Sequence, residues 1–178
     1  QRQMCIRDRR IGGIILTDML KNCQLCPRAC GADRTKSRGA CGAGIEIEAA
    51  RASLHMWEEP PISGTNGSGT VFFSHCSLGC VFCQNRKISR REAEGQNITA
   101  DALAKTFLSL EKKGAHNINL VTGAHYVPQI IEALQIARKQ GLSLPVVYNS
   151  SGYEQVETLQ LLDGHIDIYL PDYKYYSC

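Results

Sequence analysis

Three cysteines in one short segment form the clearest chemical motif of the sequence. Cys76, Cys80 and Cys83 have the spacing C-x3-C-x2-C. Three thiolates on one loop can ligate three irons of a 4Fe–4S cluster, for which four cysteines are usual. The missing fourth ligand would leave one iron open to a substrate or cofactor. The alternatives are a zinc knuckle that borrows the adjacent His75, or inert buried thiols, although zinc sites usually consist of two close-spaced pairs of ligands.

A second group of cysteines precedes this motif. Cys23, Cys26, Cys30 and Cys41 provide four thiolates within nineteen residues. Four soft ligands suit either zinc or a fully ligated iron–sulfur cluster. Either metal would help to fold a segment that has few apolar residues. We therefore expect a second metal site with a structural role, in preference to an electron-relay or substrate-binding role.

The elements that must position these cysteines alternate between strands and helices from residue 70 onward. The expected strands are 70–74, 117–122, 145–149 and 166–170, and the expected helices are 99–113, 127–140 and 153–162. Apolar, β-branched strands that alternate with amphipathic helices indicate an α/β fold with a parallel sheet covered by helices. A barrel, or part of one, is the natural closure of such a sheet.

Unusual polar residues follow each expected strand. His75 and the three cysteines follow the first, residues 122–125 the second, residues 149–152 the third, and Asp172 and Lys174 the fourth. In barrels of this type the chemistry lies in loops at the carboxyl ends of the strands. Asp172 and Lys174 are separated by one position, so their side chains share a face. The barrel mouth is favoured for them because charges buried against the helix layer would be costly to desolvate.

The first third of the chain has a different character. Residues 22–68 are rich in Gly, Cys, Arg and Pro and predict a loop-rich module with one short hairpin around residues 45–53. The glycines of residues 63–69 form a turn in this interpretation, because the Lys-Ser/Thr of a phosphate loop does not follow them. Residues 4–9 resemble a translated sequencing adapter, so we predict a non-native leader at 1–9, a cysteine-rich module at 10–68 and a partial barrel at 69–178 that is truncated after Cys178.

Composition limits the classes of protein that fit. The chain has 178 residues, 43% of them hydrophobic and 21% charged, as expected for one soluble domain. The net charge of +3 arises within the first ten residues, so the remainder is neutral and gives no support to nucleic-acid binding. No stretch approaches eighteen apolar residues, so we expect no membrane span. Close-spaced cysteines without a secretion signal favour metal binding in a reducing compartment, here the cytoplasm.

Taken with these features, the sequence resembles the radical S-adenosylmethionine (SAM) superfamily. Within it, residues 76–85, 114–121 and 167–174 are similar to the PflX-like branch of homologues of pyruvate formate-lyase activating enzyme, and the resemblance runs from about residue 23 to 176. It implies a six-unit partial barrel, of which about four units are present, and a 4Fe–4S cluster on Cys76, Cys80 and Cys83. SAM would chelate the open iron, and an electron from the cluster would cleave it to methionine and a 5′-deoxyadenosyl radical.

The resemblance also implies partners. In the activating enzymes the radical abstracts hydrogen from a glycine of a partner protein, so a glycyl-radical enzyme is the expected partner. A low-potential reductant such as flavodoxin or ferredoxin would supply the electron. The alternatives are a radical SAM enzyme that acts on a small molecule, and a non-enzymatic iron–sulfur or zinc protein.

Individual cofactor contacts are carried over from the family. Phe82 matches an aromatic position that packs near the adenine, with plain core packing as the alternative, and Asn85 matches a polar position two residues after the third cysteine. Thr122 and Gly123 stand where a glycine-rich stretch binds the amino group of SAM. In this chain that stretch retains one glycine and lacks the usual acidic residue.

Two further stretches of the chain, near residues 149 and 172, are matched to the family in the same way. Asn149 and Ser150 align with an Asp-Thr-Asn-Gly stretch, with asparagine in place of the aspartate, which weakens any cation site there. Asp172 and Lys174 match an Asp-x-Lys that lies beside SAM and the bound glycyl segment, and we expect them to be the catalytic pair. His55 and residues 57–59 precede the first strand and are candidates to line the mouth of the active site, although a lone histidine is more often a structural residue.

Overall fold

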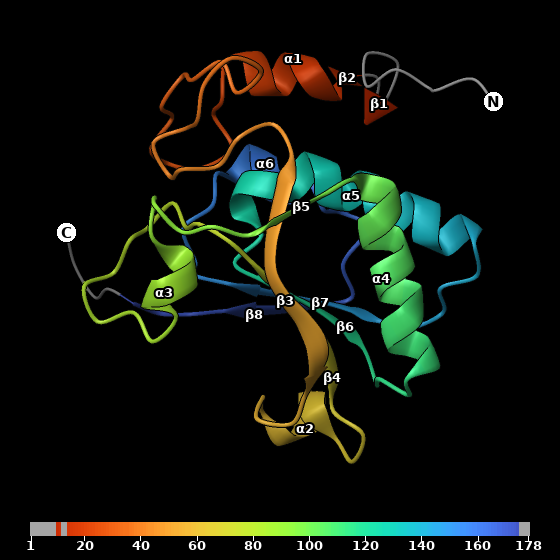
Figure 1. Ribbon diagram of the computed structural model, residues 1–178. Helices are drawn as coiled ribbons and strands as arrows, with labels where there is room; N and C mark the ends of the chain where they lie inside the picture. The colour runs from red at the N-terminus through yellow and green to blue at the C-terminus, as the bar shows by residue number, and fades with distance from the viewer. Residues whose placement is uncertain (1–9, 12–13, 175–178) are drawn as a thin grey trace.

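Four adjacent parallel strands form the larger part of a six-stranded sheet in the computed structural model of the chain (Figure 1). The structure describes residues 10–11 and 14–174, so the predicted leader and Cys178 lie outside the described residues. The sheet order is β5-β3-β4-β6-β7-β8. The strands are β3 (Ile47–His55), β4 (Ser68–Phe73), β5 (Gln96–Ile98), β6 (Ile118–Val121), β7 (Val146–Ser150) and β8 (Ile168–Pro171). Strands β4, β6, β7 and β8 are parallel, as the alternation of strands and helices predicts.

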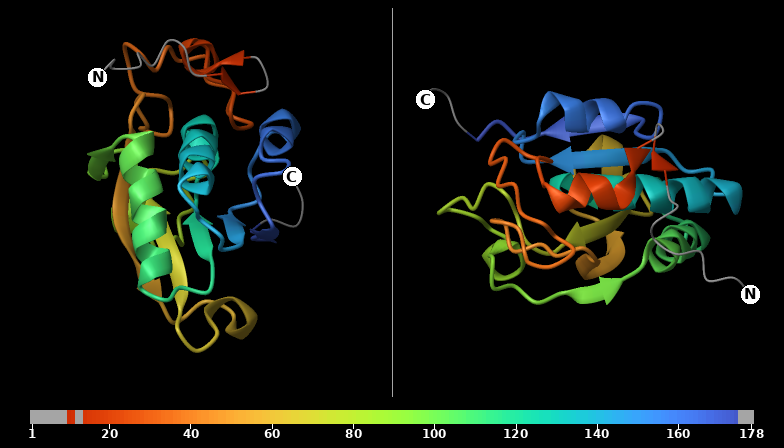
Figure 2. Two further views of the ribbon diagram at one scale, coloured as in Figure 1. Left: turned by 90° about the vertical axis from the view of Figure 1, so that its right-hand side faces the viewer. Right: turned by 90° about the horizontal axis from the view of Figure 1, so that it is seen from above.

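Two amphipathic helices cover one face of this sheet. Helix α4 (Ala100–Lys112) begins where the Thr99 hydroxyl accepts a hydrogen bond from the Ala102 N–H at 3.2 Å. Helix α5 (Val127–Lys139) packs beside it. Phe107 of α4 and Ile130 of α5 are fully buried in the core that these helices form with the sheet. The short helix α6 (Val156–Leu161) continues the same layer, as Figure 2 shows.

Several strands and helices differ from the expectation. Instead of a hairpin around residues 45–53, the nine-residue strand β3 pairs antiparallel with both β4 and β5. Ser68 and Gly69, expected in a turn, belong to β4, and the reversal occurs earlier, where Gly64 and Gly67 have positive φ. The short helices α2 (Pro60–Ser63) and α3 (Arg86–Ser89) were not expected.

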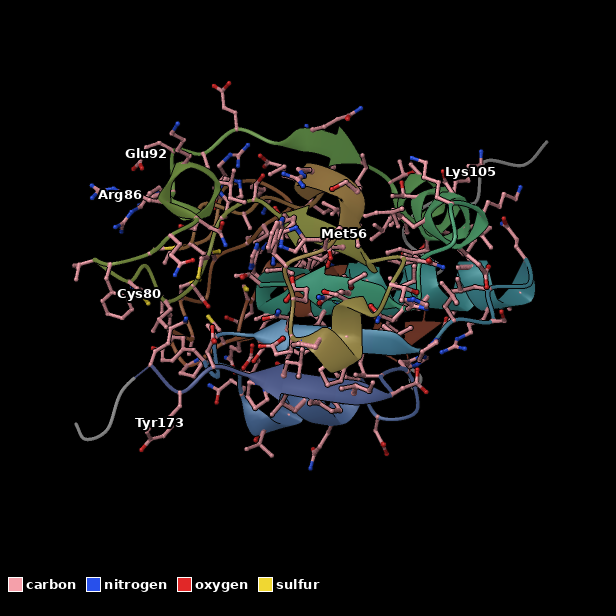
Figure 3. All side chains as sticks on the ribbon, turned by 90° about the horizontal axis from the view of Figure 1, so that it is seen from below. Met56, Cys80, Arg86, Glu92, Lys105 and Tyr173 are labelled. Atoms are coloured by element: carbon pink, nitrogen blue, oxygen red, sulfur yellow. The ribbon has the colours of Figure 1, made fainter. Side chains whose placement is uncertain are left out.

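The sheet of the described residues is open, so the barrel closure is not confirmed. Its edges are β5 and β8. Helix α2 lies across the face opposite to α4, α5 and α6, as the views in Figures 1 and 3 show. The Asn117 side chain holds α2 in place by donating to the Ile62 carbonyl at 2.7 Å. This second face is therefore partly enclosed.

The N-terminal cysteine segment follows α1 (Leu16–Lys21) and the small hairpin of β1 (Arg10–Ile11) and β2 (Ile14–Ile15). Residues 22–46 contain neither helix nor strand. Arg34, only 2% exposed, fixes this loop to the core by donating to the Gly44 and His125 carbonyls and by lying 5.4 Å from the centre of the Tyr126 ring. In the part of the chain that the structure describes, no helix has the length and apolar character needed to cross a bilayer.

Candidate active site

A cavity of about 510 Å³ lies at the carboxyl ends of the parallel strands. Most of the site residues expected from the sequence line it: Cys76, Cys80, Phe82, Cys83, Asn85, Thr122, Asn149, Asp172 and Lys174. Figure 3 shows Cys80 and Tyr173, from loops far apart in the sequence, at the same end of the molecule. The expected grouping of these residues in space is therefore observed.

The strand register explains this grouping. Phe72 of β4 pairs with Val121 of β6, and Val121 pairs with Asn149 of β7. The Asp172 N–H then donates to the Ser150 carbonyl at 2.9 Å, which continues the pairing beyond β8. Because parallel strands in register end together, the residues that follow them meet at one edge of the sheet.

The three-cysteine loop has a constrained backbone. His75, directly before the first cysteine, has φ of 70°, and Gly79 has φ of 71°. The Cys76 sulfur accepts a hydrogen bond from the Leu78 N–H at 3.4 Å, and the Cys83 sulfur lies 3.3 Å from the Ser89 hydroxyl of α3. All three cysteines are free thiols at the wall of the cavity.

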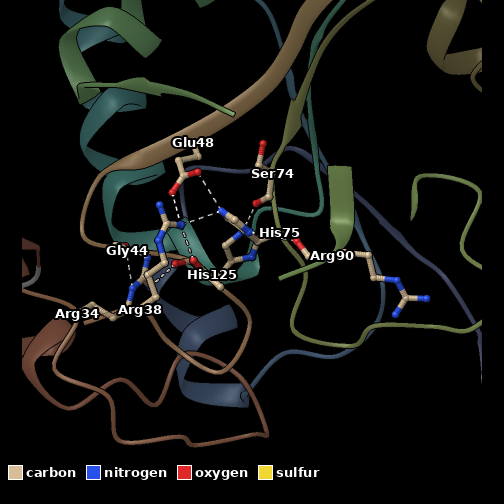
Figure 4. A network of polar contacts seen from close by, with 9 residues as sticks. Arg34, Arg38, Gly44, Glu48, Ser74, His75, Arg90 and His125 are labelled. Atoms are coloured by element: carbon tan, nitrogen blue, oxygen red, sulfur yellow. Dashed lines mark hydrogen bonds and ion pairs between the residues drawn. The ribbon is translucent and has the colours of Figure 1, made fainter. Parts of the chain in front are cut away.

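A buried polar network lies behind this loop (Figure 4). The His75 ring is completely buried, with Nε2 3.0 Å from a Glu48 carboxylate oxygen and Nδ1 3.3 Å from the Arg90 carbonyl. Arg38 donates to the other Glu48 oxygen at 2.6 Å. Both ring nitrogens of His75 are therefore engaged away from the cavity, which argues against the zinc knuckle that would borrow this residue.

The same network includes His125, which packs beneath the loop. Its Nε2 lies 2.8 Å from the Ser74 carbonyl, which assigns the proton to Nε2, and Nδ1 is buried with no hydrogen-bond partner among the described residues. Burial lowers the pKa of His125 to about 3, an effect that the Arg34 charge reinforces. His125 is therefore a neutral structural residue and does not act as an acid at neutral pH.

Asp172 and Lys174 form an ion pair at the edge of the cavity. The Asp172 carboxylate lies 2.5 Å from Lys174 Nζ. The hydrogen bond with Asp172 raises the pKa of Lys174, and the thiols of Cys80 and Cys83 act in the same direction. Lys174 therefore carries a positive charge toward the three-cysteine loop.

A carboxylate expected at the mouth of the active site lies in the same cavity. Glu58, in the loop between β3 and α2, has a side chain that is only 12% exposed. The Asn149 amide donates to it at 3.3 Å, and His55 lies 3.9 Å away. Burial raises the pKa of Glu58, and the nearby His55 opposes this shift. His55, for which a structural role was the alternative, lines the cavity as well.

Aromatic side chains stand at the rim of the cavity. Phe82 is 67% exposed and Trp57 is 88% exposed, and both line the opening. Core packing, the alternative for Phe82, is therefore wrong. Gly123 and Ser150 lie outside the cavity lining: Gly123 packs so closely that an added Cβ would lie 2.7 Å from Ile130, and the Ser150 hydroxyl donates to Glu154 at 3.2 Å.

The four N-terminal thiols lie near one another. An added Cβ at Gly39 would lie 3.6 Å from the Cys41 sulfur and 3.8 Å from the Cys30 sulfur. Burial raises the pKa of both Cys26 and Cys41, and the charge of Cys23 adds to this shift in each case. Within residues 10–11 and 14–174, however, no three His, Cys, Asp or Glu side chains are grouped closely enough to hold a single metal ion.

The two kinds of metal site make different demands on donor geometry. A single zinc ion needs donors that converge on one point, whereas each thiolate of a cubane cluster binds a different iron. Three free thiols spread along the wall of a 510 Å³ cavity therefore suit a cluster with an adjoining organic ligand. The four N-terminal thiols have the donor chemistry of a zinc or iron–sulfur site, and the structure does not confirm a metal there.

Comparison with known proteins agrees with this geometry. Residues 70–172 match the radical SAM superfamily. The chain is 31% identical over 166 residues to an uncharacterized protein of Methanocaldococcus jannaschii, and the match covers 90% of this chain and 48% of that protein. The chain thus spans about half the length of this curated relative. No solved structure matches the chain.

Proposed function

The chain belongs to the radical SAM superfamily, and from this premise we propose that it is an activating enzyme that forms a glycyl radical on a partner protein. The observation that carries the proposal is the cavity in which three free thiols meet the polar ends of four parallel strands. Family membership supports a radical SAM enzyme and implies a 4Fe–4S cluster and SAM as its cofactors. The substrate is the part that we propose here.

Three cysteines of this chain would hold the cluster: Cys76, Cys80 and Cys83. When bound, the cluster supplies the electron that cleaves SAM to methionine and a 5′-deoxyadenosyl radical. Phe82 presents an apolar ring for the adenine, while Thr122 and Asn149 offer polar groups to the rest of SAM. Such contacts fix the reacting atoms relative to each other, and an error of about 1 Å in their placement can cost roughly a hundredfold in rate.

The rim of the cavity favours a protein segment as the substrate. Trp57 and Phe82 are 88% and 67% exposed at the opening. Large aromatic side chains are enriched where proteins bind one another. Asp172 and Lys174 stand at the same opening, where a carboxylate and an ammonium group can hydrogen-bond the N–H and carbonyl groups of an incoming glycyl segment. Held in this way, the glycine Cα would be presented to the bound cofactors for the loss of one hydrogen atom.

We further propose a structural metal at Cys23, Cys26, Cys30 and Cys41, and a flavodoxin or ferredoxin as the reductant. The proximity of the four thiols supports the metal site. A metal there would contribute folding energy to a loop without helix or strand.

The proposal is tested with the purified protein after anaerobic cluster reconstitution. Wild-type protein with SAM and reductant should release 5′-deoxyadenosine, and an alanine at any one of the three cavity cysteines should abolish this release, because two thiolates cannot hold the cluster in place. Retained 5′-deoxyadenosine production in any of the three variants would refute the cluster assignment.

The substrate is tested separately. The candidate substrate is a glycyl-radical enzyme whose gene neighbours the gene of this protein. When it is mixed with the wild-type protein, SAM and reductant, it should develop the electron paramagnetic resonance signal of a glycyl radical. Release of 5′-deoxyadenosine without that signal, and its stimulation by a small molecule instead, would refute the glycyl substrate and leave the radical SAM assignment intact.

A further inference from the structure

Two arginines from separate parts of the chain hold four consecutive carbonyl groups of the three-cysteine loop. Arg28 donates from Nε to the Ser77 carbonyl and from Nη2 to the Leu78 carbonyl, the latter at 3.4 Å. Arg90 donates from Nη1 to the Gly79 carbonyl at 3.0 Å and from Nη2 to the Cys80 carbonyl at 3.1 Å. The backbone oxygens from residue 77 to residue 80 are therefore all held by guanidinium groups.

One of these peptide groups links an arginine directly to a cysteine sulfur. In a trans peptide the carbonyl and the following N–H point in opposite directions. The Ser77 carbonyl accepts from Arg28, while the N–H of the same peptide, which belongs to Leu78, donates to the Cys76 sulfur at 3.4 Å. Holding the oxygen therefore aims the N–H at the sulfur.

Both arginines are themselves held in place. Arg28 lies in the N-terminal cysteine segment, two residues after Cys26, in a turn closed by the Ala29 N–H, which donates to the Cys26 carbonyl at 2.9 Å. Arg90 follows α3, and its carbonyl lies 3.3 Å from Nδ1 of the buried His75. The loop is thus fixed from one side by the N-terminal segment and from the other by the segment after α3.

We propose that Arg28 and Arg90 are positioning residues that set the reduction potential of the cluster on Cys76, Cys80 and Cys83. This inference rests on the proposed cluster, and it assigns to the N-terminal segment an effect on the active site. Hydrogen bonds to cluster sulfurs and nearby positive charges stabilise the reduced form, which carries one more negative charge. The two arginines supply both: they orient a sulfur-directed N–H and place two positive charges behind the loop.

The test is a redox titration of the reconstituted protein, followed by electron paramagnetic resonance. Arg28→Met and Arg90→Met should each retain iron and sulfide but shift the midpoint potential to a more negative value. Arg28→Lys keeps the charge but has one nitrogen in place of the planar guanidinium that spans both carbonyls, and it should shift the potential less than Arg28→Met. Arg86 of α3, whose labelled side chain extends outward in Figure 3, is the matched control, and Arg86→Met should leave the potential unchanged.

The outcomes separate this inference from the proposed function. A potential for Arg28→Met and Arg90→Met equal to that of the wild type, with full iron content, would overturn the inference alone. A wild-type protein without any 4Fe–4S signal would overturn the proposed function. If a methionine variant does not fold, the test rests on the midpoint potential of Arg28→Lys. An unchanged potential and spectrum in Arg28→Lys would contradict a role for the paired hydrogen bonds.

Discussion

The Asp172 carboxylate lies 2.5 Å from the Lys174 ammonium, and both side chains border the cavity that contains the three cysteines. The pair stands where β8 ends, with Asp172 52% and Lys174 29% exposed. An exposed ion pair of this kind contributes little to stability. Its position beside the cavity therefore makes a role in ligand positioning the better explanation.

We predict that Asp172→Asn and Lys174→Met retain the iron content of the wild type but lower substrate-coupled turnover by roughly tenfold to a hundredfold. Each change removes one charge from the group that would hold the substrate backbone, without touching a cluster ligand. Iron analysis and turnover with the partner protein measure the two effects. Asp163→Asn, a change at an exposed carboxylate away from the cavity, is the control and should be neutral. Wild-type turnover in both cavity variants would show that the pair is only a solvated strand end without a role in positioning the substrate.

The N-terminal thiols give a second prediction, based on folding energy. Alanine at Cys23 or Cys26 should lower soluble yield and metal content, because both thiols are buried and a metal held there would stabilise the loop. Quantitative metal analysis of the purified variants provides the measurement, with Ser37→Ala in the same segment as the control. Variants that fold normally and keep their metal content but lose SAM cleavage would contradict a structural role.

The parallel part of the sheet could be predicted because each strand carries its own signal. Residues 118–121 and 146–150 are short apolar runs next to amphipathic helices, and such local patterns specify a buried strand. Strand β3 could not be predicted in the same way, because its centre is Glu-Ala-Ala-Arg-Ala, a sequence with little β preference. It becomes a strand because β4 and β5 pair with it on both sides.

The candidate site likewise has residues that could be predicted from the sequence and contacts that could not. The cysteines and the polar strand ends could be predicted, because their spacing and their place after each strand are visible in the sequence. The place of Glu58 near the mouth could be inferred from its position before the first strand, but its contact with Asn149, 91 positions away, could not. The two arginines behind the loop were likewise undetectable, since Arg28 lies 49 positions from the carbonyl that it holds.

Glu58 provides a third prediction, which concerns binding of SAM. SAM carries a net positive charge, and Glu58 is a mostly buried carboxylate in the cavity whose hydrogen-bond partner is an uncharged amide. Across a distance of about 8 Å, with an effective dielectric constant near 20, one charge pair is worth roughly 2 kcal/mol. We expect Glu58→Gln to weaken SAM binding by on the order of tenfold, measured by titration calorimetry on the reconstituted protein.

The exposed neighbour Glu59 is the matched control, and Glu59→Gln should leave the affinity unchanged. The pKa of Glu58 is raised by burial, so its charge is lost as the pH falls through a value above that of an ordinary glutamate. SAM affinity in the wild type should therefore decline with acidification earlier than in a protein with an exposed carboxylate, and Glu58→Gln should remove that decline. Equal affinities of the wild type and Glu58→Gln would exclude the electrostatic role.

The last prediction concerns the stability of the fold around His125. Its pKa is about 3 in the folded protein, against the ordinary value of 6.5, because the ring is buried. Because the pKa of His125 is depressed in the folded protein, the unfolded chain takes up the proton at a higher pH than the folded protein does. The contribution of His125 to the stability is therefore complete above pH 6.5, and it falls as the pH drops toward 3 by roughly 1.4 kcal/mol per pH unit. Substituting glutamine keeps an N–H donor for the Ser74 carbonyl and removes the titrating ring. We therefore expect Tm to fall less between about pH 7.5 and about pH 5.5 in His125→Gln than in the wild type, while substitution of the exposed His116 leaves the wild-type pH dependence in place. An identical loss of Tm in His125→Gln and the wild type would show that other groups govern the acid sensitivity.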